Sequence, residues 1–171
     1  INNRFSFNKL LLTTNFKLNT LVEQRVKFID VEIKQNIYPS LADRYVDMPI
    51  ATAKVLNLTN EKIDVKPAIL ISGINEVKIQ SPVISILPND TTEIDFYTVI
   101  SENYSGVNPE ITYANFYLMT ANDDFDDEYQ KAVLVNGINA WDGNVHHLKY
   151  FIKRDLDFSV NYSKAILSKY K

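Results

Sequence analysis

Apolar and polar residues alternate in several short segments of the chain. In one of them Ala51, Ala53 and Val55 are separated by Thr52 and Lys54. A period of two lets a strand bury one face and expose the other to water. This segment is therefore predicted to be a half-buried strand.

A second alternation, formed by Ile29, Val31 and Ile33, follows a change of phase. Val26 and Phe28 occupy the opposite parity. Because one extra residue switches which side chains face the core, we predict a β-bulge or a change of buried face near Phe28.

Three further regions predict strands. Residues 65–71 end in a continuous apolar run, and Pro67 indicates an edge or a bulge in its early part. Residues 83–87 and 94–99 flank Pro88-Asn89-Asp90, and this turn sequence predicts a hairpin.

A second hairpin is predicted from residues 111–118 and 132–135, joined by an acidic loop at 122–128. Five to seven short strands separated by turns are typical of a sandwich. The predicted fold class is mainly β, an antiparallel immunoglobulin-like β-sandwich with short helical segments at the N- and C-terminal ends.

Helical patterns are short. Residues 40–46 predict one or two turns with Ser40 as the N-cap. Residues 5–21 predict a short helix or an extended lead-in, and apolar residues recur at helical spacing from Val145 onward.

The chain has 171 residues, of which 46% are apolar and 23% charged. A chain of this size can bury a core without a metal or a disulfide. We expect one domain over residues 1–171, with a lead-in at 1–25, the sandwich at 26–136 and a helical extension at 137–171. Because the sequence starts at Ile1 rather than Met, we also expect a mature or excised piece of a longer protein.

Composition narrows the possible functions. The chain has no Cys, a formal charge of -3 and four scattered Gly. These features argue against a thiolate site, nucleic-acid binding and a phosphate-binding loop. No apolar run approaches the roughly 18 residues of a membrane-spanning helix. We expect no cofactor and no enzymatic activity; an enzyme using paired carboxylates is the third-ranked alternative.

One acidic stretch is a candidate calcium site, formed by Asp123, Asp124, Asp126, Asp127 and Glu128. The stretch lacks the Gly and the alternating oxygen ligands of an EF-hand loop. We therefore favour a solvated hairpin loop whose like charges discourage pairing with another strand.

A second candidate cluster combines His146 and His147 with Asp142. Adjacent helical side chains diverge by about 100°, so the two His cannot both face one ion, and an ordinary helix entry is favoured. Trp141 is interpreted as a plug under the sandwich.

The 10 Tyr and 9 Phe could supply a sugar-stacking face. We place Phe28, Phe96 and Phe116 at inward positions instead, where core packing is the default. A glycan site would require three or more exposed, coplanar aromatic rings.

Several stretches taken in order resemble a β-sandwich module of bacterial envelope proteins, found in chains that also carry transglutaminase-like or tetratricopeptide regions. The matching stretches are residues 38–45, 49–60, 64–71, 137–142 and 147–152. The Thr-Pro pair expected after Phe151 is absent from this chain.

The resemblance implies an immunoglobulin-like accessory domain without catalytic residues. We expect a noncatalytic structural or protein-interaction module of a larger bacterial cell-envelope protein, which is periplasmic, outer-membrane-associated or extracellular. Its partner would be a protein or a neighbouring domain of the same chain. A carbohydrate-binding module is the alternative.

Overall fold

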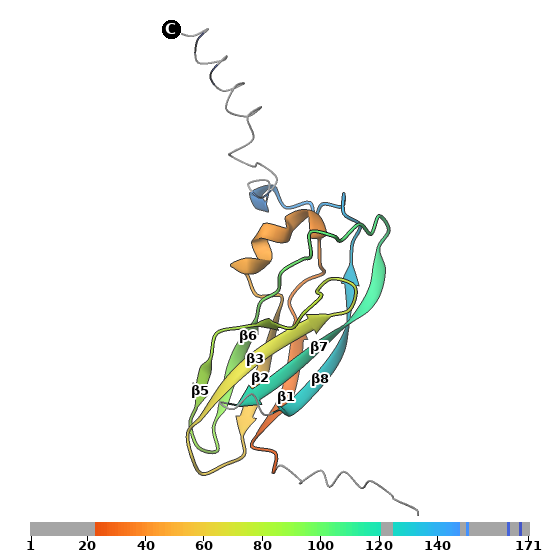
Figure 1. The fold of residues 1–171 in the computed structure, drawn as a ribbon. Helices are drawn as coiled ribbons and strands as arrows, with labels where there is room; N and C mark the ends of the chain where they lie inside the picture. Colours follow the sequence, from red (N-terminus) through yellow and green to blue (C-terminus); the bar gives the residue numbers. More distant parts are fainter. Residues whose placement is uncertain (1–22, 121–124, 148–149, 151–163, 165–167, 169–171) are drawn as a thin grey trace, which may run out of the picture.

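Two antiparallel sheets pack face to face in this computed structural model (Figure 1). The structure describes residues 23–120, 125–147, 150, 164 and 168. The first sheet has the order β1-β2-β6, with β1 at Val26–Ile33, β2 at Ala51–Asn57 and β6 at Thr91–Phe96.

The second sheet is built around β3 and β7. Its order is β4-β3-β7-β8, and β5 also pairs with β3. The strands are β3 (Ile63–Ile71), β4 (Ile79–Gln80), β5 (Ile84–Ile86), β7 (Glu110–Thr120) and β8 (Phe125–Val135). The predicted mainly β, antiparallel sandwich is confirmed.

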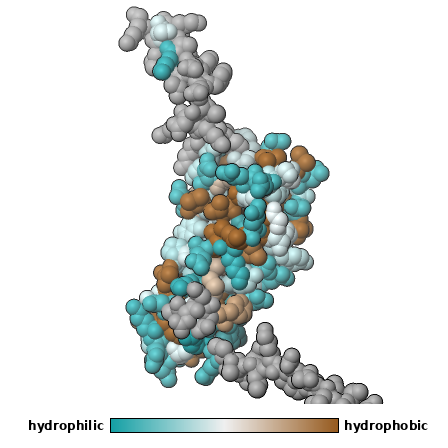
Figure 2. Space-filling model, in the orientation of Figure 1, coloured by the Kyte–Doolittle hydropathy of each residue, from teal (hydrophilic) through white to brown (hydrophobic). Residues whose placement is uncertain are grey.

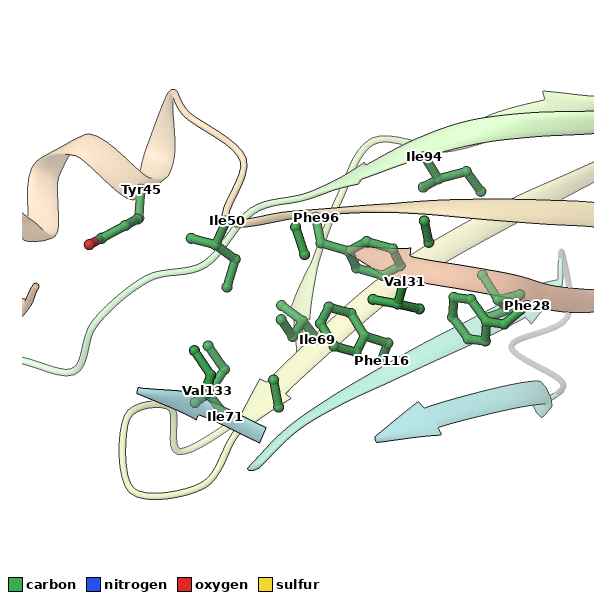
Figure 3. Close-up of a cluster of buried hydrophobic side chains, with 14 of the residues drawn as sticks. Phe28, Val31, Tyr45, Ile50, Ile69, Ile71, Ile94, Phe96, Phe116 and Val133 are labelled. Atoms are coloured by element: carbon green, nitrogen blue, oxygen red, sulfur yellow. The ribbon is translucent and has the colours of Figure 1, made fainter. Parts of the chain in front are cut away.

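Aromatic rings from both sheets meet in the core (Figure 3). Phe96 of β6 lies edge-on to Phe116 of β7, with ring centroids 5.0 Å apart. Phe28 of β1 packs 6.2 Å from Phe96. All three side chains are buried, as their inward parity predicts, and they join the two layers.

The predicted bulge lies in β1. The register of β1 against β2 shifts between Phe28 and Asp30. The intervening Ile29 is 53% exposed, and burial resumes at Val31. The extra residue therefore keeps Phe28 and Val31 on the core side despite their odd spacing.

The first predicted hairpin is wrong, although its turn is present. Strand β5 pairs with β3 in the second sheet, and β6 pairs with β2 in the first. The chain turns at Asn89, whose φ is 55°, and the Asp90 N–H donates to the Leu87 carbonyl at 3.2 Å. The turn residues specify reversal of the chain, but partners more distant in sequence determine which sheet each arm joins.

The second predicted hairpin is β7–β8, but its acidic part differs from the prediction. Strand β8 begins at Phe125, so Asp126, Asp127 and Glu128 lie in a strand rather than in a loop. Asp123 and Asp124 are outside the described residues.

Pro67 lies inside β3, where the neighbour on one side changes. Residues Ile63 to Val65 pair with β5, whereas Ala68 and Ile69 pair with β4. Pro67 faces Leu118 of β7 on the other side. Pro67, which has no N–H to donate, thus lies at the point where β3 changes its neighbour from β5 to β4.

A 3-10 helix, η1 (Pro39–Val46), covers one end of the sandwich (Figure 1). Leu41 and Tyr45 point into the core, and the Tyr45 hydroxyl accepts the Tyr38 N–H at 2.7 Å. Ser40 is not the N-cap that we predicted, because Tyr38 takes that position and the Ser40 hydroxyl donates to the Ala140 carbonyl.

A second short 3-10 helix, η2 (Val145–His147), follows β8 at the same end. The predicted segment at residues 5–21 lies outside the described residues. Of the predicted C-terminal helix, only residues 150, 164 and 168 are described beyond η2, and all three are helical.

Side chains of β8 form hydrogen bonds with backbone groups along the outer edge of β1. The Asp126 carboxylate accepts the N–H groups of Arg25 and Val26 at 3.2 and 3.0 Å, and Asp127 accepts the Phe28 N–H at 2.8 Å. Lys131 donates to the Val31 carbonyl. The edges of the two sheets are thus joined by side chains instead of a backbone ladder, which leaves less of the β1 edge open to pairing.

Candidate functional site

An apolar groove runs between η1 and the chain that follows β6. It consists of three depressions of about 350, 420 and 180 Å³, all of which include Val99. The first and second also share Val46, and the second and third share Ile79. We call this surface the Val99 groove.

Aliphatic side chains line the groove and remain open to water. The exposed fractions are 59% for Val46, 66% for Val77, 47% for Val99 and 38% for Ile138. Figure 2 shows hydrophobic surface gathered at the end of the sandwich that carries η1. Contiguous apolar surface of this kind marks an interaction site more often than scattered exposed residues do.

One wall of the groove is a face of η1. Pro39, Ala42 and Val46 line it together with Asp43. The backbone departs from helical geometry at Leu41 (φ -109°, ψ 29°), so these residues come from two short turns and do not form one regular stripe. Tyr45 of the same helix is buried in the core.

The other wall is held in place by a polar side chain. The Asn75 side-chain oxygen Oδ1 accepts the Ile71 N–H at 3.0 Å, and the side-chain nitrogen Nδ2 donates to the Thr98 hydroxyl at 3.1 Å. The same amide also donates to the Val99 carbonyl. These bonds fix the backbone of Val99 and leave its side chain exposed.

Ile138 closes one end of the groove through a tight backbone contact. The Ile138 N–H donates to the Gly106 carbonyl at 2.8 Å. A Cβ at Gly137 would lie 2.0 Å from the Val107 carbonyl oxygen. Only glycine permits this approach, which carries the chain after β8 past the end of η1.

The rim of the groove is acidic. Four exposed carboxylate residues line the three depressions, and no Lys, Arg or His does so: Asp43, Asp47, Glu76 and Glu102. The electrostatic complement of this surface is an apolar segment that carries basic residues.

A polar cluster lies on another side of η1. Asp142 Oδ2 is 2.5 Å from His147 Nδ1 and 3.3 Å from Arg44 Nη1, and Arg44 Nη2 donates to Gln35 Oε1 at 2.5 Å. The side chains of Arg44, Asp142 and His147 are each 13% exposed or less.

Burial raises the pKa of Asp142, but stabilisation of its charge outweighs that effect. The Asn144 N–H, His147 and Arg44 together hold the pKa below its ordinary value of 3.8. Arg44 and His147 therefore favour an ionised Asp142, and the cluster attaches residues 142–147 to η1.

The two His do not converge on one point. His147 faces Asp142, whereas His146 is exposed and its N–H donates to the Asn144 side chain at 3.0 Å. Among the described residues, no three His, Asp, Glu or Cys side chains gather closely enough to hold a metal ion.

Of the five calcium candidates, Asp126 and Asp127 turn their carboxylates toward β1, as described above. Glu128 is exposed and follows them in β8. The carboxylates of Asp126 and Asp127 therefore have backbone N–H partners, which a calcium ion would have to displace.

Trp141 is not a plug under the sandwich, contrary to our prediction. Its side chain is 45% exposed. It belongs to the segment that leaves β8 and crosses η1, where Ala140 and Asp142 make the attachments to the helix. Ala140 and Asp142 thus attach this segment to η1, and the indole of Trp141 itself remains partly exposed to water.

Three aromatic residues lie on β7 and β8 away from the core. Tyr113 and Phe125 are about half exposed, and Tyr117 is partly buried under the Lys78 ammonium, 3.7 Å from the ring centroid. The rings of Tyr117 and Phe125 are inclined by 65°. This pair does not form the flat platform that our glycan criterion required.

The sequence interpretation missed the Val99 groove. Val46, Val77 and Val99 are of the same residue type as many core positions. No motif in the sequence distinguishes them from buried valines. A weak signal was available in the acidic residues that neighbour them, namely Asp47, Glu76 and Glu102.

Among the described residues, no helix is long and apolar enough to cross a membrane. No known protein family matches the chain, and no curated protein matches it. A solved structure, the FixG-related protein of Vibrio parahaemolyticus, is similar at 16% identity with a TM-score of 0.44, over 65% of this chain and 96% of that one.

Proposed function

We propose that this chain is a noncatalytic structural or protein-interaction module of a larger bacterial cell-envelope protein. It acts by docking a neighbouring domain of the same chain, or a protein partner, in the Val99 groove. The observation that carries the proposal is the contiguous exposure of Val46, Val77 and Val99 between two fixed walls.

Burial of these side chains would release water from apolar surface, which is the main driving force for association. The walls are already held by the Asn75 bonds and by the core contacts of η1. Binding of a partner would therefore cost little free energy for ordering the groove, because its walls are already fixed.

The envelope setting rests on the resemblance of residues 38–71 and 137–152 to sandwich modules of bacterial envelope proteins. A periplasmic, outer-membrane-associated or extracellular location follows from the same resemblance. Immunoblotting of fractionated cells tests it, and recovery in the cytoplasmic fraction alone would contradict it.

The docking role is tested by hydrogen exchange in the longer protein. Val99→Asp places a charge in one wall, and the backbone amides of residues 42–46 in the opposite wall report whether the groove is occupied. We expect their exchange to accelerate at least about tenfold, because a docked segment would leave.

Leu87→Asp is the matched control, since Leu87 is an exposed aliphatic residue in the β5–β6 turn. It should leave exchange at residues 42–46 unchanged. Equal exchange in the wild type and in Val99→Asp would refute docking at this groove.

Carbohydrate binding is the second candidate: the flat platform is missing, but Tyr113 and Phe125 on the second sheet each expose a ring on which a single sugar could stack. Stacking of a sugar ring on Tyr113 should be lost in Tyr113→Ala. A glycan array without a hit for the wild-type chain would remove this candidate.

A further inference from the structure

We infer that the Val99 groove takes a short segment of the neighbouring domain in the longer protein, and that this segment carries Lys or Arg beside aliphatic residues. The inference rests on the docking function proposed above and specifies the chemistry of the occupant. It follows from the unbalanced charge of the rim, from two carboxylates that face one depression, and from the small size of the groove.

The negative charge of the rim has no counter-charge in the described part of the chain. None of the four rim carboxylates forms an ion pair there. The two cations nearest to them in sequence point elsewhere. Arg44 binds Asp142 at 3.3 Å, and the Lys78 ammonium lies 3.7 Å from the centre of the Tyr117 ring. The rim therefore attracts positive charge from an occupant.

The first depression has a carboxylate on each of its two walls. Asp43 belongs to η1 and Glu102 to the chain after β6, and both line this depression together with Val46 and Val99. Neither carboxylate has a hydrogen-bond partner among the described residues. A Lys or Arg side chain suits such a depression, because its methylene stem covers apolar surface while its charged head stays at the polar edge.

The second depression is suited to an aliphatic side chain. Ile79, Pro82 and Val99 line it, and Asp47 is the one rim carboxylate that it includes. It shares Val46 and Val99 with the first depression, so the two lie side by side. The occupant therefore presents a basic residue and an aliphatic residue on the same face.

The third depression contributes charge but no free carboxylate. Glu76 Oε1 accepts hydrogen bonds from the Ser101 hydroxyl at 3.5 Å and from the Asn103 amide at 3.2 Å. These partners are neutral, so the charge of Glu76 still adds to the attraction of the rim. The direct contact with a basic residue is assigned to the first depression.

The size of the groove favours a short segment on the same polypeptide. Its largest depression measures about 420 Å³, and ion pairs at an exposed rim contribute little affinity. A segment held by such contacts binds weakly from solution. When it belongs to the same chain, its effective concentration reaches the order of millimolar, which compensates for the weak contacts.

A random peptide library tests the chemistry of the occupant without assuming its sequence. Twelve-residue peptides displayed on phage are selected on the 171-residue chain. Counter-selection on Val99→Asn removes peptides that bind outside the groove. We expect the selected peptides to carry Lys or Arg beside Leu, Ile or Val. Peptides without an excess of basic residues, or no selected peptide at all, would overturn the inference.

Removal of single charges tests the first depression. A synthetic peptide of the selected consensus should bind Asp43→Asn and Glu102→Gln about two to five times more weakly than the wild type, as exposed ion pairs predict. Glu128→Gln is the matched control, because Glu128 is exposed on β8 and does not line the groove. Equal binding to the wild type and to all three variants would overturn the assignment of a basic residue to this depression.

The longer protein tests the source of the segment. If its own segment fills the groove, the same peptide should bind it at least about tenfold more weakly than the 171-residue chain, because the peptide competes with a tethered segment. Equal affinity for the two proteins would overturn the neighbouring domain as the source.

Failure of this inference is distinguishable from failure of the docking function. If selection yields no basic peptides while Val99→Asp still accelerates exchange at residues 42–46 in the longer protein, the docking function stands. Only the chemistry of the occupant is then wrong.

Discussion

Asp126 on β8 accepts the backbone N–H of Val26 on β1 at 3.0 Å, across a gap of 100 residues in sequence. The carboxylate side chain is fully buried and also lies 3.5 Å from the Arg25 guanidinium. A stretch that resembles a charged surface loop in the sequence therefore contributes to the joint between the two sheets.

Asp126→Ala should destabilise the protein by about 2 to 4 kcal/mol, because it leaves the N–H groups of Arg25 and Val26 without their acceptor and removes the carboxylate beside the Arg25 guanidinium. Asp126→Asn keeps an acceptor oxygen and should cost less. Urea denaturation measures the change, and Glu128→Ala in the same strand should stay within about 0.5 kcal/mol. Equal effects of Asp126→Ala and Glu128→Ala would show that the joint contributes no stability.

Calcium should not stabilise the fold. Asp126 and Asp127 already bind β1 N–H groups, so an ion would have to break these bonds. We expect the same Tm in millimolar CaCl2 and in EDTA. A rise in Tm with calcium that Asp127→Asn removes would instead support a site in the acidic stretch.

The polar cluster predicts an acid-dependent loss of stability. Because the pKa of Asp142 lies below its ordinary value of 3.8, the ionised carboxylate stabilises the folded state above pH 3.8. This contribution is lost as pH falls below 3.8 through the folded-state pKa. The difference in unfolding free energy between the wild type and Asp142→Asn should shrink over that range, and a constant difference down to pH 2 would contradict this assignment.

Tyr45→Phe should cost about 1 to 3 kcal/mol, since it leaves the Tyr38 N–H without its acceptor. Tyr97→Phe is a suitable control, because no described hydrogen bond joins its hydroxyl to the rest of the chain, and should cost no more than about 0.5 kcal/mol. Thermal denaturation of both variants makes the comparison.

Burial raises the pKa of Tyr45 to about 12. Its neutral form is therefore favoured in the folded state, and the associated stability should decline from pH 10 toward pH 12. Tyr45→Phe should lack this component of the alkaline decline. Ionisation of every Tyr near pH 10 in the folded protein would contradict the assignment.

Alternation and turn chemistry predicted most of the strands and the bulge, but not β4, and β8 begins at Phe125 instead of at residue 132. Ala51, Ala53 and Val55 are all buried, and the change of phase at Phe28 marks the register shift. These features are determined by residues close together in the sequence, so the local pattern of apolar and polar positions is enough to predict them.

The incorrect predictions concern partners distant in sequence. Ser40 has the chemistry of an N-cap but bonds to Ala140, 100 residues away. The Pro88-Asn89-Asp90 turn was recognised, yet nothing local shows that its two arms enter different sheets. Asp126 and Asp127 read as loop residues because their β1 partners lie about 100 residues earlier.

The joint between β1 and β8 has a kinetic consequence. Closing a loop of about 100 residues has an entropic cost that must be met before its contacts form, and topologies with such separations fold slowly. During synthesis β1 can pair with β2, but its outer edge stays uncovered until the ribosome has completed β8. Until then its edge is a hazard for aggregation, and the nascent chain would benefit from a chaperone during this interval.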